Sequence, residues 1–74
     1  MPKVEITTEV AGSVWKIEAS VGDLLAAEEV ILILESMKME IPIETPCAGK
    51  IIEILVNEAD SVDEDQVIAI IEIP

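Results

Sequence analysis

The chain has 74 residues, enough for one small domain, and its Asp and Glu outnumber its Lys by 16 to 4, which gives a formal net charge of −12. Phosphate binding needs clustered Lys and Arg, so this charge argues against nucleic-acid partners and against an anionic membrane surface. The sequence has no His, which excludes His-dependent nucleophilic catalysis and His-ligated metal sites.

Ile and Val supply 21 of the 74 residues. Because β-branched side chains pack well on a pleated surface, we expect one all-β domain over residues 1–74. No apolar run reaches the roughly 20 residues that span a bilayer, and the N-terminus does not look like a targeting peptide. Cys47 is the only cysteine, so no internal disulfide can form. We therefore expect a cytoplasmic protein without metal or catalytic residues.

Six strands are predicted in chain order, with polar or Ala-Gly turns between them. They cover residues 4–8, 13–19, 30–34, 41–45, 50–56 and 67–71. Pro42 and Pro46 bracket the fourth strand, and proline belongs at strand ends or sheet edges because it donates no ladder hydrogen bond. Trp15 alternates with Ile17 and Ala19, which predicts that its ring packs inside the domain.

The two halves of the chain repeat each other. A shift of 37 residues aligns ten identical pairs without an insertion, among them Thr8 with Thr45 and Ala11-Gly12 with Ala48-Gly49. Neither half can bury a sheet alone, so we expect two small antiparallel sheets related by a pseudo-twofold axis, as a flattened β-barrel or sandwich.

The segment between the two repeats is the candidate site. Ser36-Met37-Lys38-Met39-Glu40 joins two predicted strands, and under the pseudo-twofold its counterpart is the pair of chain termini. Lys38 is therefore expected at an exposed tip, opposite the termini. The flanking Met37 and Met39 are unusual at an exposed turn, but methionine adapts well to recognition surfaces.

Glu35-Ser36-Met37-Lys38-Met39-Glu40 resembles the attachment signature of biotin carboxyl carrier domains, in which a lysine lies between two methionines. The resemblance extends over the whole chain and includes the repeat, Ala11-Gly12 and Ala48-Gly49. It is closest to small stand-alone proteins of the biotinyl/lipoyl attachment family. The fold that it implies is the barrel-sandwich hybrid.

The resemblance also implies a function. A biotin protein ligase would attach biotin covalently to Lys38, with Met37, Met39, Glu35 and Glu40 as recognition residues. The domain would then carry carboxybiotin between a biotin carboxylase and a carboxyltransferase, and would catalyse nothing itself. The sequence does not name the acceptor of the carboxyl group.

The chain departs from the family in its polar loops, where glycine is usual near three positions that here hold Glu28, Ala59 and Asp65. Those turns must either avoid positive φ or hold strain, since only glycine adopts positive φ freely.

Two other functions fit the same fold. A lipoyl carrier is disfavoured because lipoyl domains typically have Asp before the lysine, where this chain has Met37. An unmodified structural hammerhead domain lacks the Met-Lys-Met tip. An independent enzyme is the weakest alternative, for want of a nucleophile, a metal site or a phosphate-binding loop.

Overall fold

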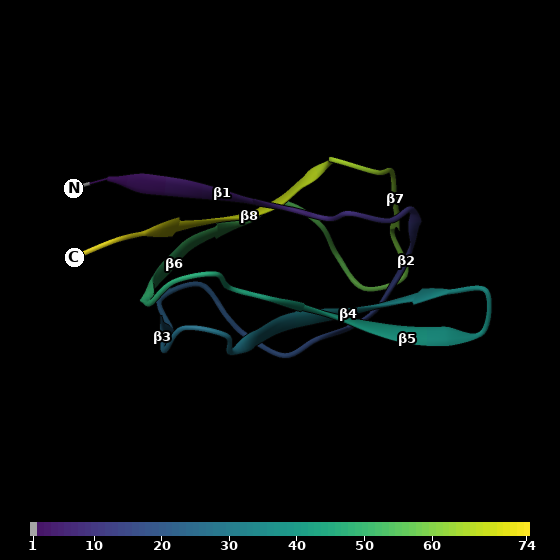
Figure 1. Ribbon diagram of the computed structural model, residues 1–74, viewed down its shortest axis with the longest axis horizontal. Coiled ribbons are helices and arrows are strands. Elements are labelled where there is room, and N and C mark those ends of the chain that lie inside the picture. The colour runs from purple at the N-terminus through teal and green to yellow at the C-terminus, as the bar shows by residue number, and fades with distance from the viewer. Residues whose placement is uncertain (1) are drawn as a thin grey trace.

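A computed structural model describes residues 2–74 and confirms the all-β prediction (Figure 1). Every regular element in this part of the chain is a strand. The strands are β1 (Lys3–Thr7), β2 (Gly12–Ile17), β3 (Leu24–Leu25), β4 (Val30–Ser36), β5 (Met39–Glu44), β6 (Gly49–Ile54), β7 (Ser61–Val62) and β8 (Val67–Glu72).

The strands form two four-stranded antiparallel sheets. One has the order β1-β8-β6-β3 and the other β5-β4-β2-β7, so each sheet takes strands from both halves of the chain. The sheets face each other in a body of 36 × 18 × 17 Å (Figure 1). The long, narrow outline is that of the flattened barrel that the repeat predicts.

Strand register confirms the pseudo-twofold. Gly12 pairs with Val62 in one sheet, and the positions 37 residues away, Gly49 and Leu25, pair in the other. The β-bulges repeat as well: β2 is shifted against β4 between Val14 and Lys16, and β6 against β8 between Ile51 and Glu53. The relation between the halves is therefore structural and does not arise from composition alone.

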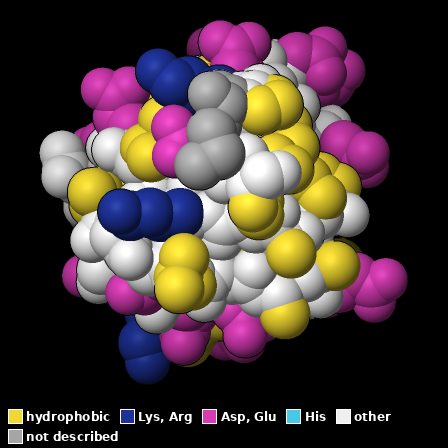
Figure 2. All heavy atoms as spheres, turned by 90° about the vertical axis from the view of Figure 1, so that its left-hand side faces the viewer, with side chains coloured by type: hydrophobic (Ala, Val, Ile, Leu, Met, Phe, Trp, Pro, Cys, Tyr) yellow, Lys and Arg dark blue, Asp and Glu magenta, His cyan; other side chains and the backbone are white. Residues whose placement is uncertain are grey.

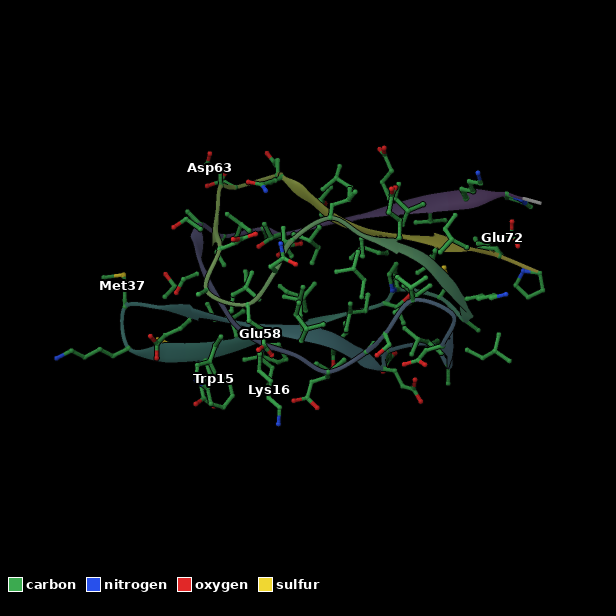
Figure 3. The ribbon with its side chains drawn as sticks, turned by 180° about the vertical axis from the view of Figure 1, so that it is seen from behind. Trp15, Lys16, Met37, Glu58, Asp63 and Glu72 are labelled. Carbon is green, nitrogen blue, oxygen red and sulfur yellow. The ribbon has the colours of Figure 1, made fainter. Side chains whose placement is uncertain are left out.

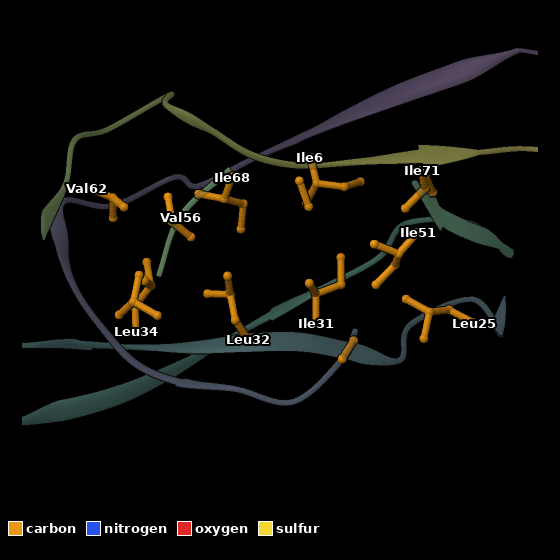
Figure 4. Packing of buried hydrophobic residues seen from close by; sticks show 13 residues of the cluster. Ile6, Leu25, Ile31, Leu32, Leu34, Ile51, Val56, Val62, Ile68 and Ile71 are labelled. Atoms are coloured by element: carbon orange, nitrogen blue, oxygen red, sulfur yellow. The ribbon is translucent and has the colours of Figure 1, made fainter. Parts of the chain in front are cut away.

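The core lies between the two sheets and is aliphatic (Figure 4). Its fully buried side chains come from both halves, as with Ile31 and Ile68, which occupy equivalent positions. Thr8 and Thr45 are buried too, and each hydroxyl donates to the carbonyl oxygen two residues on, at 2.8 Å to Val10 and 2.6 Å to Cys47. Both hydroxyl groups therefore have a hydrogen-bond partner, so the burial of these two polar residues leaves no hydrogen bond unmade.

The structure corrects the predicted elements in two respects. β3 and β7 are two-residue strands in segments that were expected to be loops, and each completes the edge of a sheet. Pro42 lies inside β5 instead of at its end, opposite Ile33 of β4. Because β5 is an edge strand, proline is tolerated there, as the sequence rule requires.

Trp15 does not pack inside the domain, contrary to the prediction. Its side chain is 49% exposed. The bulge in β2 explains the error, because it inserts one residue between Val14, opposite Leu34, and Lys16, opposite Ile33. Strict alternation from Val14 would point Lys16 inward, and this charged residue is the one sign of a bulge in the sequence.

The glycine-poor loops adopt positive φ. Glu28, Ala59 and Asp65 have φ angles of 70°, 76° and 65°, and Gly22, the counterpart of Ala59, has a φ of 98°. The loops therefore place three residues with side chains in a region that costs each about 1–2 kcal/mol.

The ends of the described chain lie side by side. The Ile73 amide donates to the Pro2 carbonyl oxygen at 2.8 Å, and the turn between β4 and β5 is at the other end of the molecule (Figure 1). Met1, which was also expected near Pro74, lies outside the described residues.

Candidate functional site

The predicted tip is a tight β-hairpin. β4 and β5 pair up to Ser36 and Met39, which leaves Met37 and Lys38 as the only two loop residues. Their φ angles are 51° and 66°. Two successive residues at positive φ are the requirement of a type I′ turn, whose twist matches that of the flanking strands.

The tip side chains point into solvent. Lys38 is exposed, Met37 is 92% exposed and Met39 is 64% exposed. Figure 3 shows Met37 projecting from the end of the hairpin, clear of the two sheets. A methionine so exposed does not cover the end of the barrel.

The charges around the tip are unbalanced. Glu35 and Glu40 are opposite each other on β4 and β5, and both are exposed. In residues 2–74 the one ion pair joins Lys16 to Glu18 at 3.5 Å, so no carboxylate of that part of the chain holds the Lys38 amine. The amine is therefore free to enter another protein's active site.

A close contact between β2 and β4 supports the hairpin from behind. A Cβ atom on Gly12 would lie 2.7 Å from the Glu35 carbonyl oxygen and 3.3 Å from the Ser36 Cβ atom. Any side chain at position 12 would push this part of β4 away. Gly12 thus lets β2 pack directly against the strand that leads into the tip.

The other end of the molecule has a different surface. An apolar hollow of about 260 Å³ lies there, lined by residues that include Leu24, Leu25, Lys50 and Pro74. Hydrophobic side chains gather on this end, and Asp and Glu lie around its margin (Figure 2). The hollow lies at the opposite end of the molecule from the tip, so its residues do not contact Lys38.

Residues 2–74 offer neither a metal site nor a membrane-spanning helix. No group of three or more His, Cys, Asp or Glu is arranged there to hold a metal ion. That part of the chain also has no helix long and apolar enough to cross a membrane.

The structure brings all five predicted site residues together. Met37 and Lys38 form the turn, and Glu35, Met39 and Glu40 flank it on the two paired strands. The sequence did not predict the exposure of Trp15, which Figure 3 shows projecting from the same sheet as the hairpin, on the side that faces away from the other sheet.

Known proteins share both sequence and fold with this chain. It is 43% identical over 67 residues to urea amidolyase of Saccharomyces cerevisiae, covering 90% of this chain and 4% of that protein. It is 38% identical over 63 residues to the biotin/lipoyl attachment protein of Bacillus subtilis, covering 85% and 86%. The urea carboxylase structure from Kluyveromyces lactis matches with a TM-score of 0.92 at 30% identity, over 97% of this chain and 6% of that one.

The two-sheet fold and the exposed lysine at its tip define a carrier domain. The family model described as "Biotin-requiring enzyme" matches residues 1–71, and the chain belongs to this biotin/lipoyl attachment family. Within it the chain is a biotin carboxyl carrier-like domain. It spans only 4% of the urea amidolyase length, but most of the attachment protein.

Proposed function

We propose that a biotin protein ligase attaches biotin to Lys38 and that the domain carries a carboxyl group on it. The observation that carries this proposal is the tip itself: an exposed lysine in a two-residue left-handed turn between two exposed methionines. The resemblance to biotin-requiring proteins supports biotin as the attached group.

The residues of the tip fit this group. Lys38 offers a primary amine on a flexible four-carbon stem, and nothing in residues 2–74 pairs with it. In the attachment step the Lys38 nitrogen forms an amide bond to the carboxyl carbon of activated biotin, while the activating group leaves with the bonding electrons. The amine loses its protons to the ligase or to solvent. Met37, Met39, Glu35 and Glu40 contribute recognition surface in this step.

Once attached, biotin supplies a ring nitrogen that takes up and releases a carboxyl group. The chain's own contribution is a short rigid hairpin that carries the arm away from the two sheets. Because the hairpin is fixed and the arm is flexible, a group attached to one lysine can reach two separate active sites. We propose that these belong to a biotin carboxylase and a carboxyltransferase in the cytoplasm. Relatives that include urea amidolyase and pyruvate carboxylase support carboxylase partners.

Intact-mass measurement tests the proposal. The chain is produced together with a biotin protein ligase and excess biotin, and we expect complete addition of one biotin with loss of one water. Lys38→Arg, which keeps the charge, should abolish the addition. The matched controls Lys3→Arg, Lys16→Arg and Lys50→Arg change exposed lysines elsewhere and should be biotinylated like the parent chain.

Persisting biotin on Lys38→Arg would contradict the assignment. Addition of a lipoyl group by a lipoate ligase, with no biotin added under the matched conditions, would instead favour the lipoyl carrier.

A further inference from the structure

Trp15 is an exposed aromatic residue that lies outside the turn holding Lys38. It is the only aromatic residue of the chain, and about half of its side chain contacts water. Tryptophan is among the residues that most often dominate protein–protein binding energies, because its ring offers a large rigid contact area. An exposed tryptophan close to the attachment tip is therefore a candidate binding residue.

The position of Trp15 cannot be explained by the fold alone. The same bulge occurs in the other sheet, where the equivalent residue is Ile52, which is only partly exposed. An aliphatic residue therefore occupies the bulge in the sheet that lacks Lys38. Tryptophan occupies it only in the sheet that also carries Lys38.

The charges at the tip also differ from those at the equivalent place in the other half of the molecule. Glu72 of β8 is paired across the sheet with Lys3 on one side and Lys50 on the other, an opposite-charge arrangement. Its counterpart Glu35 is paired with Glu40 and Ser13. Like charges directly opposite each other destabilise a sheet, so this acidic pair works against the fold and favours an external cation.

The size of the molecule limits what the tip can do alone. Its accessible surface is 4586 Å², and a standard interface needs about 800 Å² from each partner, roughly a sixth of that surface. A two-residue turn cannot supply this area. Because the unmodified lysine has only a four-carbon stem, an enzyme that modifies Lys38 must also come close to the surface beside the tip.

We infer that Trp15 extends the proposed recognition residues Glu35 and Glu40 into a docking surface for the biotin protein ligase, on the outer face of the sheet that carries the tip. This inference rests on the proposed attachment at Lys38. The ligase surface that fits is basic, with Arg or Lys opposite the two carboxylates and an apolar or guanidinium plane against the indole ring. The carboxylase can dock elsewhere, because biotin lengthens the arm that it must reach.

Binding without chemistry gives the first test. The Lys38→Ala chain is labelled with ¹⁵N and titrated with purified ligase, and its single indole N–H reports on Trp15. We expect this signal, and the amide signals of Glu35 and Glu40, to shift or broaden more than those of Leu24 and Lys50 at the opposite end. Unchanged indole signals at saturating ligase would overturn the docking surface.

Steady-state biotinylation gives the second test. Trp15→Ala should raise the KM of the ligase for the chain about tenfold, with kcat little changed, because truncating a central aromatic contact weakens binding by about this factor. Leu24→Ala is the matched control, since Leu24 is 81% exposed at the opposite end, and its KM should equal that of the parent chain. Circular dichroism verifies that both variants are folded.

The outcomes separate the two proposals. Biotinylation of the parent chain at Lys38, with the same KM for Trp15→Ala, would overturn the docking surface and leave the attachment site intact. No biotinylation of the parent chain would overturn both.

Discussion

Single residues in this domain hold backbone strain in two functionally different places. Met37 and Lys38 are strained at the tip, while Glu28, Ala59 and Asp65 are strained in loops. Strain at a site is often retained because the geometry is needed there. The pseudo-twofold allows the loop strain to be measured directly, because glycine occurs at one of two equivalent positions and alanine at the other.

Ala59→Gly should stabilise the fold. Ala59 is exposed and has a φ of 76°, so glycine removes strain without removing packing. We expect the free energy of unfolding to rise by about 0.5–1 kcal/mol, the strain of roughly 1–2 kcal/mol less the extra chain entropy of glycine. The midpoint of thermal unfolding, followed by circular dichroism, should rise by a few degrees.

Two matched variants control this prediction. Gly22→Ala introduces the same strain at the equivalent loop, where a Cβ atom would meet nothing within 4 Å, and should lower stability by about 1 kcal/mol. Ala27→Gly changes an exposed alanine that lacks positive φ and should only lower stability slightly. A loss of stability in Ala59→Gly equal to that in Ala27→Gly would contradict the account.

Among the elements, the long strands could be predicted and the bulges and shortest strands could not. Apolar runs such as residues 30–34 and 67–71 give β4 and β8 directly, because both strands are largely buried. β3 and β7 are two residues long, which is too short for any periodicity. The bulge at Trp15 depends on pairing with β4, which no local pattern in the sequence fixes, so the sequence predicted the exposed lysine at the tip but not its neighbour on the surface.

The tip hairpin should become more stable when its function is removed. Asn-Gly is the preferred sequence of a type I′ turn, so replacing Met37 by Asn and Lys38 by Gly should relieve the strain at both positions. We expect the free energy of unfolding to rise by roughly 1–2 kcal/mol, measured by urea denaturation, with complete loss of biotinylation.

Lys38→Ala is the matched control for the turn, since it also removes the amine but keeps a side chain at a φ of 66°. It should lose biotinylation and gain no stability from relief of strain. Equal stability of the two variants would mean that the turn holds no strain.

At the scale of the whole molecule, the repeat was the most informative feature of the sequence. It predicted that the tip and the termini occupy equivalent places, and the structure agrees: Ser36 pairs with Met39 at one end, and Pro2 bonds to Ile73 at the other. Composition alone would have indicated only a β domain. The matched Ala-Gly turns and the shift of 37 residues placed Lys38 at an end of the barrel.

Circular permutation tests this symmetry together with the function. Joining Pro74 to Met1 by a short Gly/Ser linker should lower stability little, because Pro2 and Ile73 are already hydrogen-bonded and a short loop has a modest closure entropy. Reopening the chain between Ala26 and Ala27 leaves β3 and β4 whole, and should give a folded domain that is still biotinylated at Lys38. Circular dichroism and intact mass measure the two properties.

Two further openings of the linked chain distinguish the symmetry from simple tolerance of cuts. Opening between Met37 and Lys38 cuts the place equivalent to the two ends of this chain. The domain should therefore fold with nearly the parent's thermal midpoint, but it should no longer be a ligase substrate. Opening between Ile51 and Ile52 cuts β6, which lies between β8 and β3 in its sheet, and should prevent folding because two strand pairings lose their continuity. If the chain opened at the tip fails to fold while the chain opened between Ala26 and Ala27 folds, the prediction is wrong. An intact tip is then required for folding, although the tip and the termini occupy equivalent places in the folded structure.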